Sequence, residues 1–327
     1  LFPEVPRNHP AVGQMMMNFS ANLLGLDNAA TPFGIRAMES LQELNPHKEK
    51  ASNAQVMFLA LHASGLTLIP VSVIAMRASV NPPAANPTDI FVPCMIVTFV
   101  ATLVAMTAVS VKQRINLLQP VLIAWILGMS AVIAALIWYL ASLDHGALQR
   151  FSLVLSNGLI LLIFLVFLLG ALWKKVNVFE AFVEGARGGF EIAVRIIPYL
   201  IAMLVAISVL RNSGVFGYII EGLTSFFAAV GINTDFVASL PTALMKPLSG
   251  SGARGMMVDA MNTHGADSFI GRLSSIFQGT SDTTFYVVAV YFGAVAIRNT
   301  RYSIPVMLLA DLAGIITAIV IAYLFFH

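Results

Sequence analysis

Residues 278–284, Gln-Gly-Thr-Ser-Asp-Thr-Thr, interrupt an otherwise apolar segment that runs from 268 to 297. A second apolar segment, 55–77, is interrupted by a Ser-Gly pair and a proline. An unpaired backbone group is costly in lipid, so a membrane helix breaks only where protein or a water-filled cavity covers the break. Each break is therefore a candidate site, and together they indicate a membrane protein with broken helices.

The composition supports a membrane location. The 327 residues are 58% hydrophobic and 10% charged, with a mean hydropathy of +0.85, which leaves too little polar surface for a water-soluble enzyme. A net charge of +2 provides no basic field for nucleic acid, and six histidines with one cysteine argue against a His/Cys metal cluster. Because the sequence lacks Walker-type, metalloprotease and hydrolase motifs, we expect no enzyme.

Four further apolar segments are uninterrupted and long enough to cross the hydrocarbon core, which takes about 20 helical residues. Lysine and arginine in short loops indicate the cytoplasmic ends, whereas the loop 78–89 contains neither and should face the other compartment. The four predicted spans are 88–111, 116–143, 150–173 and 303–326, and the expected cytoplasmic residues are Lys112, Arg114, Lys174, Lys175, Arg298 and Arg301.

Three blocks of the sequence occur twice in the same order, which indicates an internal duplication. A small-residue turn into a methionine-rich helix comes first, a hydroxyl-rich break second and a proline-led span third. The loop before the proline-led span carries arginines only in the second copy, so the copies should point in opposite directions through the membrane. Chance similarity among apolar helices is the alternative. The paired blocks are 28–38 with 251–261, 51–67 with 266–284, and 90–93 with 303–305.

Inverted repeats with breaks at equivalent positions are the architecture of secondary transporters. We divide the chain into a first repeat at 1–112, a connecting transmembrane helix and loop at 113–149, and a second repeat at 150–327. About 70 residues at 150–223 precede the second copy without a counterpart before the first. We therefore expect the source protein to contain a further N-terminal segment with at least one span.

The repeated blocks also resemble a known family. Gly25-Leu-Asp-Asn-Ala-Ala-Thr-Pro-Phe-Gly-Ile-Arg-Ala-Met38, Asn45-Pro46 and Ala51-Ser-Asn53 resemble spore maturation protein A. Pro247-Leu-Ser-Gly-Ser-Gly-Ala253, Gln278-Gly-Thr-Ser-Asp-Thr-Thr-Phe-Tyr286 and Tyr291-Phe-Gly293 look like spore maturation protein B. The chain departs from the A pattern at His62-Ala63-Ser64, where that pattern has Asn-Thr-Ser.

The resemblance implies a fused form with two Gate, or nucleoside-recognition, domains, a type shared with concentrative nucleoside transporters and the ferrous-iron transporter B. It implies an all-α, polytopic protein of the bacterial cytoplasmic (inner) membrane. Two inverted Gate-type repeats, re-entrant turns and broken transmembrane helices are expected. A sporulation phenotype gives the family its name, so the resemblance indicates fold and location better than it indicates a substrate.

Polar residues near the breaks are the candidates for substrate binding. Ser249-Gly-Ser-Gly-Ala-Arg254 is a small-residue turn into a helix, which would point free N–H groups at an anion, with the arginine adding a bidentate contact. A turn that needs small residues for packing is the alternative. In the first copy, Asn28 and Thr31 stand near a helix start, with helix capping as the alternative. The substrate-binding candidates are Asn28, Thr31, Ser64, Ser249, Ser251, Arg254, Gln278 and Thr280.

Asp282 lies among hydroxyl side chains in the second broken span. Because intramembrane carboxylates are costly, the run indicates an ion-coupling site for Na⁺ or H⁺. Helix packing through small polar residues is the alternative, but it explains the hydroxyls and not the carboxylate. Asp311 belongs to the same set, although a buried pair with Arg254 or Arg272 is favoured for it. The ion-coupling candidates are Ser281, Asp282, Thr283 and Asp311.

Two other ionisable residues receive simpler interpretations. His62 stands among leucine, alanine and methionine, and such a lone histidine is more often a packed polar residue than a proton carrier. Lys246 is long enough to reach the membrane interface with its charged end.

We therefore expect a protein that moves a small polar or anionic metabolite, nucleoside-like or dicarboxylate-like, coupled to Na⁺ or H⁺ and without another cofactor. The expected partners are membrane lipid and a small-molecule substrate, with a homo-oligomer left open and nucleic acid excluded. Two alternatives stay open: a non-transporting structural or regulatory protein of envelope or spore maturation, and a flippase for a lipid-linked substrate.

Overall fold

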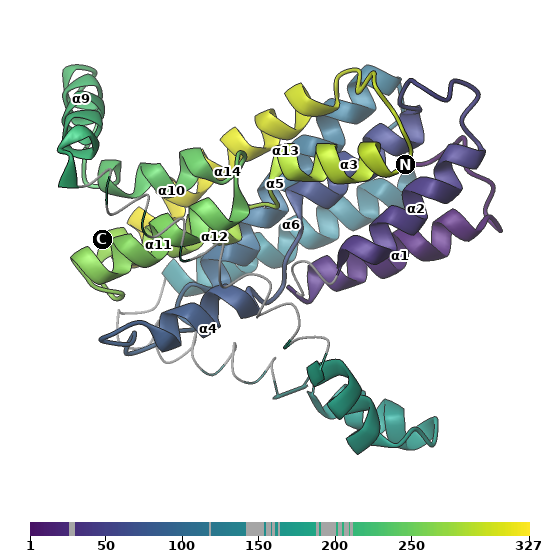
Figure 1. The fold of residues 1–327 in the computed structure, drawn as a ribbon, viewed down its shortest axis with the longest axis horizontal. Coiled ribbons are helices and arrows are strands. Elements are labelled where there is room, and N and C mark those ends of the chain that lie inside the picture. Colours follow the sequence, from purple (N-terminus) through teal and green to yellow (C-terminus); the bar gives the residue numbers. More distant parts are fainter. Residues whose placement is uncertain are drawn as a thin grey trace.

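The structure is a computed structural model in which helices are joined by short connections (Figure 1). It describes residues 1–25, 30–117, 119–141, 164–187 and 212–327, together with a few isolated positions between 142 and 211. Within these ranges no β-strand occurs, and Lys50 and Asn299 form one isolated bridge. The predicted all-α class is confirmed for these residues.

The same order of elements occurs twice along the described chain. A helix, a broken helix and a long helix follow one another from α2 to α5 and again from α11 to α14. The first half contains α1 (Pro10–Leu23), α2 (Thr31–Glu43), α3 (Asn53–Ser64), α4 (Val71–Ser79), α5 (Phe91–Gln113) and α6 (Pro120–Ala141). The second contains α9 (Val215–Ala229), the 3₁₀ helix η2 (Val237–Ser239), α10 (Leu240–Met245), α11 (Gly250–His264), α12 (Phe269–Gly279), α13 (Thr284–Val287), the π-helix η3 (Val288–Phe292) and α14 (Ser303–Phe326).

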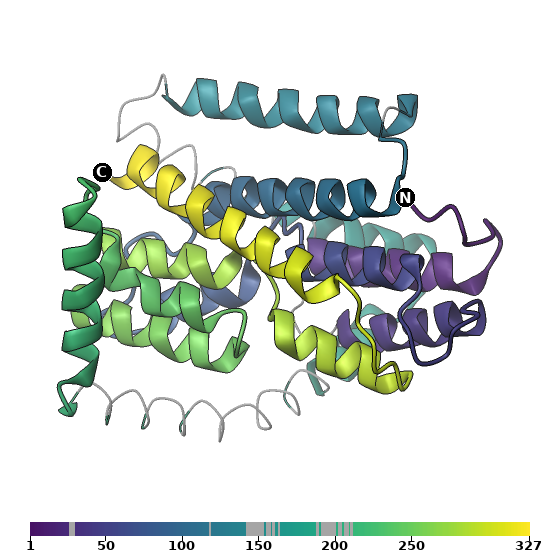
Figure 2. The same cartoon turned by 90° about the horizontal axis from the view of Figure 1, so that it is seen from above.

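α5 and α14 pack against each other in opposite directions. Met307 near the start of α14 shares a core cluster with Val109 near the end of α5. Phe325 at the end of α14 shares another with Phe91 at the start of α5. Between them, a Cβ on Gly314 would lie 3.7 Å from that of Ala101. Figure 2 shows α14 crossing beside α5.

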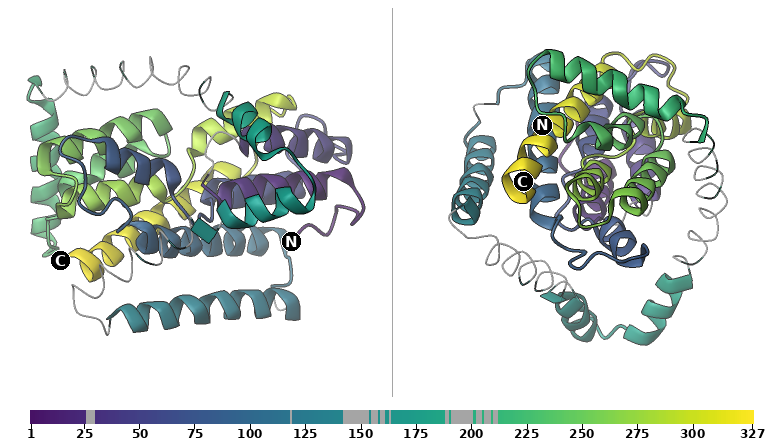
Figure 3. Two further views of the ribbon diagram at one scale, coloured as in Figure 1. Left: turned by 90° about the horizontal axis from the view of Figure 1, so that it is seen from below. Right: turned by 90° about the vertical axis from the view of Figure 1, so that its left-hand side faces the viewer.

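α5 and α14 are also the two helices among the described residues that are long and apolar enough to cross a membrane. They correspond to the predicted spans 88–111 and 303–326. The predicted span 116–143 contains α6, which lies alongside α5 but outside the packed body (Figures 2 and 3). Of the predicted span 150–173, the structure describes a continuous helix over Phe164–Trp173.

Each half of the chain contributes part of its broken helix to the core of the other half. One core cluster combines residues of α1, α2 and α3 with Val287 of α13 and Tyr291 of η3. A second combines residues of α10, α11 and α12 with Val73 of α4. In Figure 1 these two groups of helices lie toward opposite ends of α5 and α14. The halves are therefore exchanged rather than placed side by side.

Two arginines reinforce this exchange at the starts of α3 and α12. Arg301 donates from Nη1 to the carbonyl of Ala51, 3.1 Å away, just before α3. Arg77 donates from Nη1 to the carbonyl of Ala266, 2.8 Å away, just before α12. Ala51 and Ala266 are equivalent in the duplicated blocks, so each half offers the same carbonyl to an arginine of the other half.

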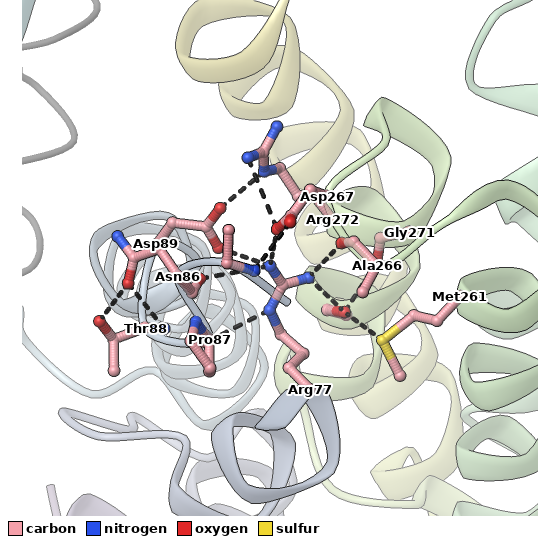
Figure 4. Close-up of polar contacts among 12 residues, drawn as sticks. Arg77, Asn86, Pro87, Thr88, Asp89, Met261, Ala266, Asp267, Gly271 and Arg272 are labelled. Carbon is pink, nitrogen blue, oxygen red and sulfur yellow. Dashed lines mark hydrogen bonds and ion pairs between the residues drawn. The ribbon is translucent and has the colours of Figure 1, made fainter. Parts of the chain in front are cut away.

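The second of these contacts belongs to a buried ionic cluster (Figure 4). Arg77 is completely buried, and its Nη2 lies 2.9 Å from Oδ1 of Asp89. Arg272 at the start of α12 approaches the other oxygen of Asp89 at 2.6 Å. Asp267 adds longer contacts of 3.5 Å to Arg77 and 3.8 Å to Arg272. One buried carboxylate thus holds two arginines from different halves.

We predict that Asp89→Asn destabilises the protein strongly, because the buried guanidinium of Arg77 and the partly exposed one of Arg272 would then keep only the longer contacts to the exposed Asp267. Breaking a buried pair costs about 3–5 kcal/mol. Asp267→Asn is the matched control, since its side chain is 37% exposed and exposed pairs contribute about 0–1 kcal/mol. Thermal unfolding of the purified protein in detergent measures both. Equal unfolding midpoints for the two variants would contradict a central role for Asp89.

Candidate functional site

The two broken helices meet at their breaks. α3 ends at Gly65, which adopts a left-handed conformation (φ 47°), and α12 ends at Gly279. The backbone N–H of Asp282, just after the second break, donates to the carbonyl of Ala63 at the end of α3, over 2.8 Å. Each break therefore supplies a hydrogen-bond partner that the other has lost, which is what a helix interrupted inside a membrane requires.

A small cavity of about 70 Å³ lies at this meeting point, with space for a few water molecules. Gln278 is 5% exposed, and its amide oxygen is buried without a hydrogen-bond partner. Buried polar atoms in proteins are nearly always paired, so this oxygen marks a place for a bound group. The polar part of the lining consists of Asn22, Thr67, Ser72, Lys246, Gln278, Ser281 and Asp282.

His62 and Asp282 contact each other at the edge of the cavity. Nε2 of His62 lies 3.2 Å from Oδ2 of Asp282. The other oxygen of Asp282 accepts a hydrogen bond from the backbone N–H of Thr283 at 2.7 Å. The side chain of His62 is 2% exposed and that of Asp282 is 33% exposed, so the carboxylate faces the cavity and the imidazole lies behind it.

Two asparagines of α1 hold the other side of the imidazole. Nδ1 of His62 lies 2.8 Å from Oδ1 of Asn18 and 2.9 Å from Nδ2 of Asn22. The Tyr291 ring packs edge-on against the imidazole, with the ring centres 4.8 Å apart. Tyr291 can lie there only because position 34 is glycine, since a Cβ on Gly34 would approach the tyrosine ring to 2.3 Å. The π-helical turn that carries Tyr291 is a local feature often found at functional sites.

Asp311 of α14 lies behind the second break and is 5% exposed. The hydroxyl of Thr284 donates to its Oδ2 at 2.7 Å. The expected pairing of Asp311 with Arg272 is wrong, because Arg272 bonds Asp89 instead. Pairing of Asp311 with the other arginine considered for it, Arg254, stays a prediction.

Among the predicted site residues, Gln278, Ser281 and Asp282 line the cavity. Thr280 does not, because its hydroxyl donates to the carbonyl of Phe277 at 2.8 Å. The hydroxyl of Ser64 similarly donates back to its own helix, 3.1 Å from the carbonyl of Leu61.

The turn before α11 is a helix cap beside the break. The Ser249 hydroxyl accepts from the N–H of Gly252 at 3.0 Å and lies 3.3 Å from that of Ser251. A Cβ on Gly250 would approach Oγ1 of Thr283 to 2.7 Å, so the turn packs closely on the break. The described residues that line the cavity do not include Ser249, Ser251 or Arg254.

The equivalent helix start in the first half is α2. It begins at Thr31 after Ala30, and neither side chain there makes a capping hydrogen bond, so the capping role considered for Thr31 is wrong. Asn28 lies outside the described residues.

Several residues of the site were not expected from the sequence. Lys246 is 8% exposed and lines the cavity, so the expectation that it reaches the membrane interface is wrong. Asn18 and Asn22 were missed, although two asparagines four positions apart in an apolar helix share one face and could have been noticed. Thr67 lines the cavity just after the first break.

Comparison with known proteins shows which family the sequence belongs to. The Gate family, described as nucleoside recognition, matches residues 193–298. The chain is 48% identical over 172 residues to spore maturation protein B of Bacillus subtilis (strain 168), which covers 53% of the chain and 95% of that protein. It is 45% identical over 101 residues to spore maturation protein A of the same organism, covering 31% of the chain and 50% of that protein. No solved structure is significantly similar.

Both resemblances predicted from the sequence motifs are thus confirmed by identity over long stretches. The match to protein B extends over nearly its whole length, whereas the match to protein A extends over half. The chain belongs to the spore maturation protein A/B family, with a Gate domain in its second half.

Proposed function

We propose that the chain is a secondary-transporter-like protein of the bacterial inner membrane. It crosses the membrane several times and moves a small polar or anionic metabolite, nucleoside-like or dicarboxylate-like, coupled to Na⁺ or H⁺. The description of the Gate family as nucleoside recognition is compatible with a metabolite of this kind.

The arrangement of the halves supports two inverted repeats. α5 and α14 are equivalent in the duplicated blocks, and they run in opposite directions. Each half also gives the far part of its broken helix to the other, and this reciprocal exchange is compatible with a two-fold relation between the halves. Inverted repeats of this type hold substrate and ion near the middle of the membrane, between discontinuous helices.

The observation that carries the proposal is the polar cavity between the two breaks. It brings a cation, Lys246, a carboxylate, Asp282, and the unpartnered amide oxygen of Gln278 to one small space. Ionisable groups at membrane depth are costly and mark transport pathways. A purely structural protein would have no need for these three groups to face a common cavity.

The size of the cavity bears on how a substrate would enter. Its volume of about 70 Å³ is well below the roughly 300–1,000 Å³ of pockets that enclose small molecules. A metabolite would therefore bind only after the two groups of helices move relative to each other. Such rocking of one repeat against the other is the usual movement of transporters built from inverted repeats.

The alternatives keep some support. The names of both relatives refer to spore maturation, which is compatible with a structural or regulatory role in the envelope. A flippase is favoured by a second, mostly apolar cavity of about 440 Å³, lined by Phe19, Leu61 and Met106, which shares Asn22 with the polar cavity. A polar headgroup and its lipid chain would suit two such cavities side by side.

A ligand of the polar cavity should stabilise the full chain in detergent. At about 100 times its dissociation constant it adds about 2.7 kcal/mol, which thermal unfolding detects. Nucleosides, dicarboxylates and amino acids are to be compared, each in NaCl and in choline chloride. Gln278→Leu should lose most of the stabilisation without lowering the midpoint in the absence of ligand, because it removes an unpartnered oxygen.

Gln119→Leu is the matched control for this experiment, since Gln119 is exposed at the start of α6. It should respond to ligands as the parent does. If no ligand class stabilises the folded parent, the transport proposal is abandoned and the structural alternative takes its place.

Lys246→Met tests whether the substrate is anionic, because it keeps the apolar stem and removes the charge. We expect anionic ligands to lose about 1.5–3 kcal/mol, roughly ten- to a hundredfold in affinity, while uncharged nucleosides keep theirs. The change is measured from ligand titrations of the unfolding midpoint, with Lys112→Met at an exposed position as control. Equal losses for charged and uncharged ligands would argue against direct recognition of an anion.

A further inference from the structure

We infer that His62 and Asp282 form a proton-binding site, and that the coupling ion at the polar cavity is H⁺. This inference rests on the transport function proposed above and specifies its ion. It is argued from the partners of the two side chains and from the charges around them.

In this pair, Asp282 is the residue that a proton from the cavity reaches first, and His62 is the residue that then holds the proton. Asp282 borders the cavity with a 33% exposed side chain, and His62 lies behind it at 2%. A proton that arrives from the cavity binds Oδ2 of Asp282, which is 3.2 Å from Nε2 of His62. The O–H bond then breaks as the Nε2–H bond forms, leaving a carboxylate beside an imidazolium. The reverse transfer releases the proton to the cavity.

The two asparagines allow the imidazole to change its protonation without moving. Asn18 donates from Nδ2 to the carbonyl of Ala30 at 2.8 Å, which directs its Oδ1 toward Nδ1 of His62. Asn22 directs its Nδ2 toward the same ring atom and toward the carbonyl of His62, at 2.9 and 3.3 Å. Nδ1 thus meets both an acceptor and a donor.

At Nδ1, both the protonated and the unprotonated ring therefore find a partner. A protonated Nδ1 donates to Asn18, whether the ring is neutral or an imidazolium, and an unprotonated Nδ1 accepts from Asn22. A histidine that serves only as packing needs one such partner. Here the acceptor on Asn18 suits a protonated Nδ1, so that Nε2 is the ring atom that gains and loses the proton.

The charges around the pair also favour one additional proton. With His62 neutral and both carboxylates ionised, the described set of Asp282, Asp311 and Lys246, whose charges act on one another, has one net negative charge. One proton on the imidazole balances the set. α1 carries no charged residue, and α2 carries its charges on its exposed side. The titratable groups on the elements packed around the pair are Asp311 and Tyr323 of α14, Tyr286 of α13, Tyr291 of η3, Cys94 and Lys112 of α5, and the exposed Arg36, Glu39 and Glu43 of α2, with Lys246 in the cavity lining.

The same contacts disfavour Na⁺ at Asp282. Hard cations are held by several oxygen ligands. Here both carboxylate oxygens already interact with nitrogen, one with the backbone N–H of Thr283 and one with His62. Lys246 adds a positive charge to the lining of the same cavity. These surroundings suit a proton passed between two side chains better than a metal cation.

The test is a titration of the histidine signals of the full chain in detergent, labelled with ¹³C-histidine, from about pH 5 to about pH 9. The signal of His62 is the one that disappears in His62→Gln, with His62→Asn as a second assignment variant. We expect it to titrate in this range with the same midpoint in NaCl and in choline chloride. Asp282→Asn should change the pH dependence of this signal, because a charged group within contact distance of the imidazole is lost.

Asp267→Asn is the control, since its carboxylate lies in the ionic cluster and not at the cavity. A His62 signal that does not titrate, that ignores Asp282→Asn or that shifts with Na⁺ overturns the inference. The titration needs no substrate, so its failure is distinct from a failure of ligand binding. For any ligand that stabilises the parent, the stabilisation should vary with pH and should lose that variation in His62→Gln.

Discussion

The structure depends on how backbone groups are satisfied where two apolar helices are interrupted. A break in either helix alone would leave N–H and C=O groups unpaired, and an unpaired backbone group has a high free-energy cost in an apolar environment. Here the breaks face each other, and the hydrogen bond from Asp282 to Ala63 joins them. The polar side chains, the small cavity and the glycines that permit close approach are all gathered around this junction.

Much of the architecture could be predicted because its signals are local. The long apolar runs became α5 and α14, and the small-residue breaks at Gly65 and Gly279 lie where the composition changes. The duplicated blocks preserved the order of elements. Within the site, Gln278 and Asp282 stood out as polar residues in an apolar setting, and both line the cavity. A pattern along the chain is sufficient for such features.

The partners of these residues could not be predicted, since they come from distant parts of the chain. His62 looked like a packed histidine until Asp282 and the asparagines of α1 were placed around it. Lys246 was assigned to the membrane interface by its length alone, and one of the two arginines considered for Asp311, Arg272, bonds another carboxylate. Sequence shows which polar groups need partners, but only the exchanged arrangement of the halves decides which partners they find.

The arginine contacts between the two halves also constrain how the protein folds during its synthesis. Arg272 lies 183 residues after Asp89, and Arg301 lies 250 residues after Ala51. At about 5–20 residues per second, the ribosome needs roughly ten to forty seconds to supply the second arginine of the Asp89 cluster. During that interval the carboxylate of Asp89 can pair with Arg77 but not yet with Arg272. The ionic cluster around Asp89 can therefore be completed only after the second half of the chain has been made.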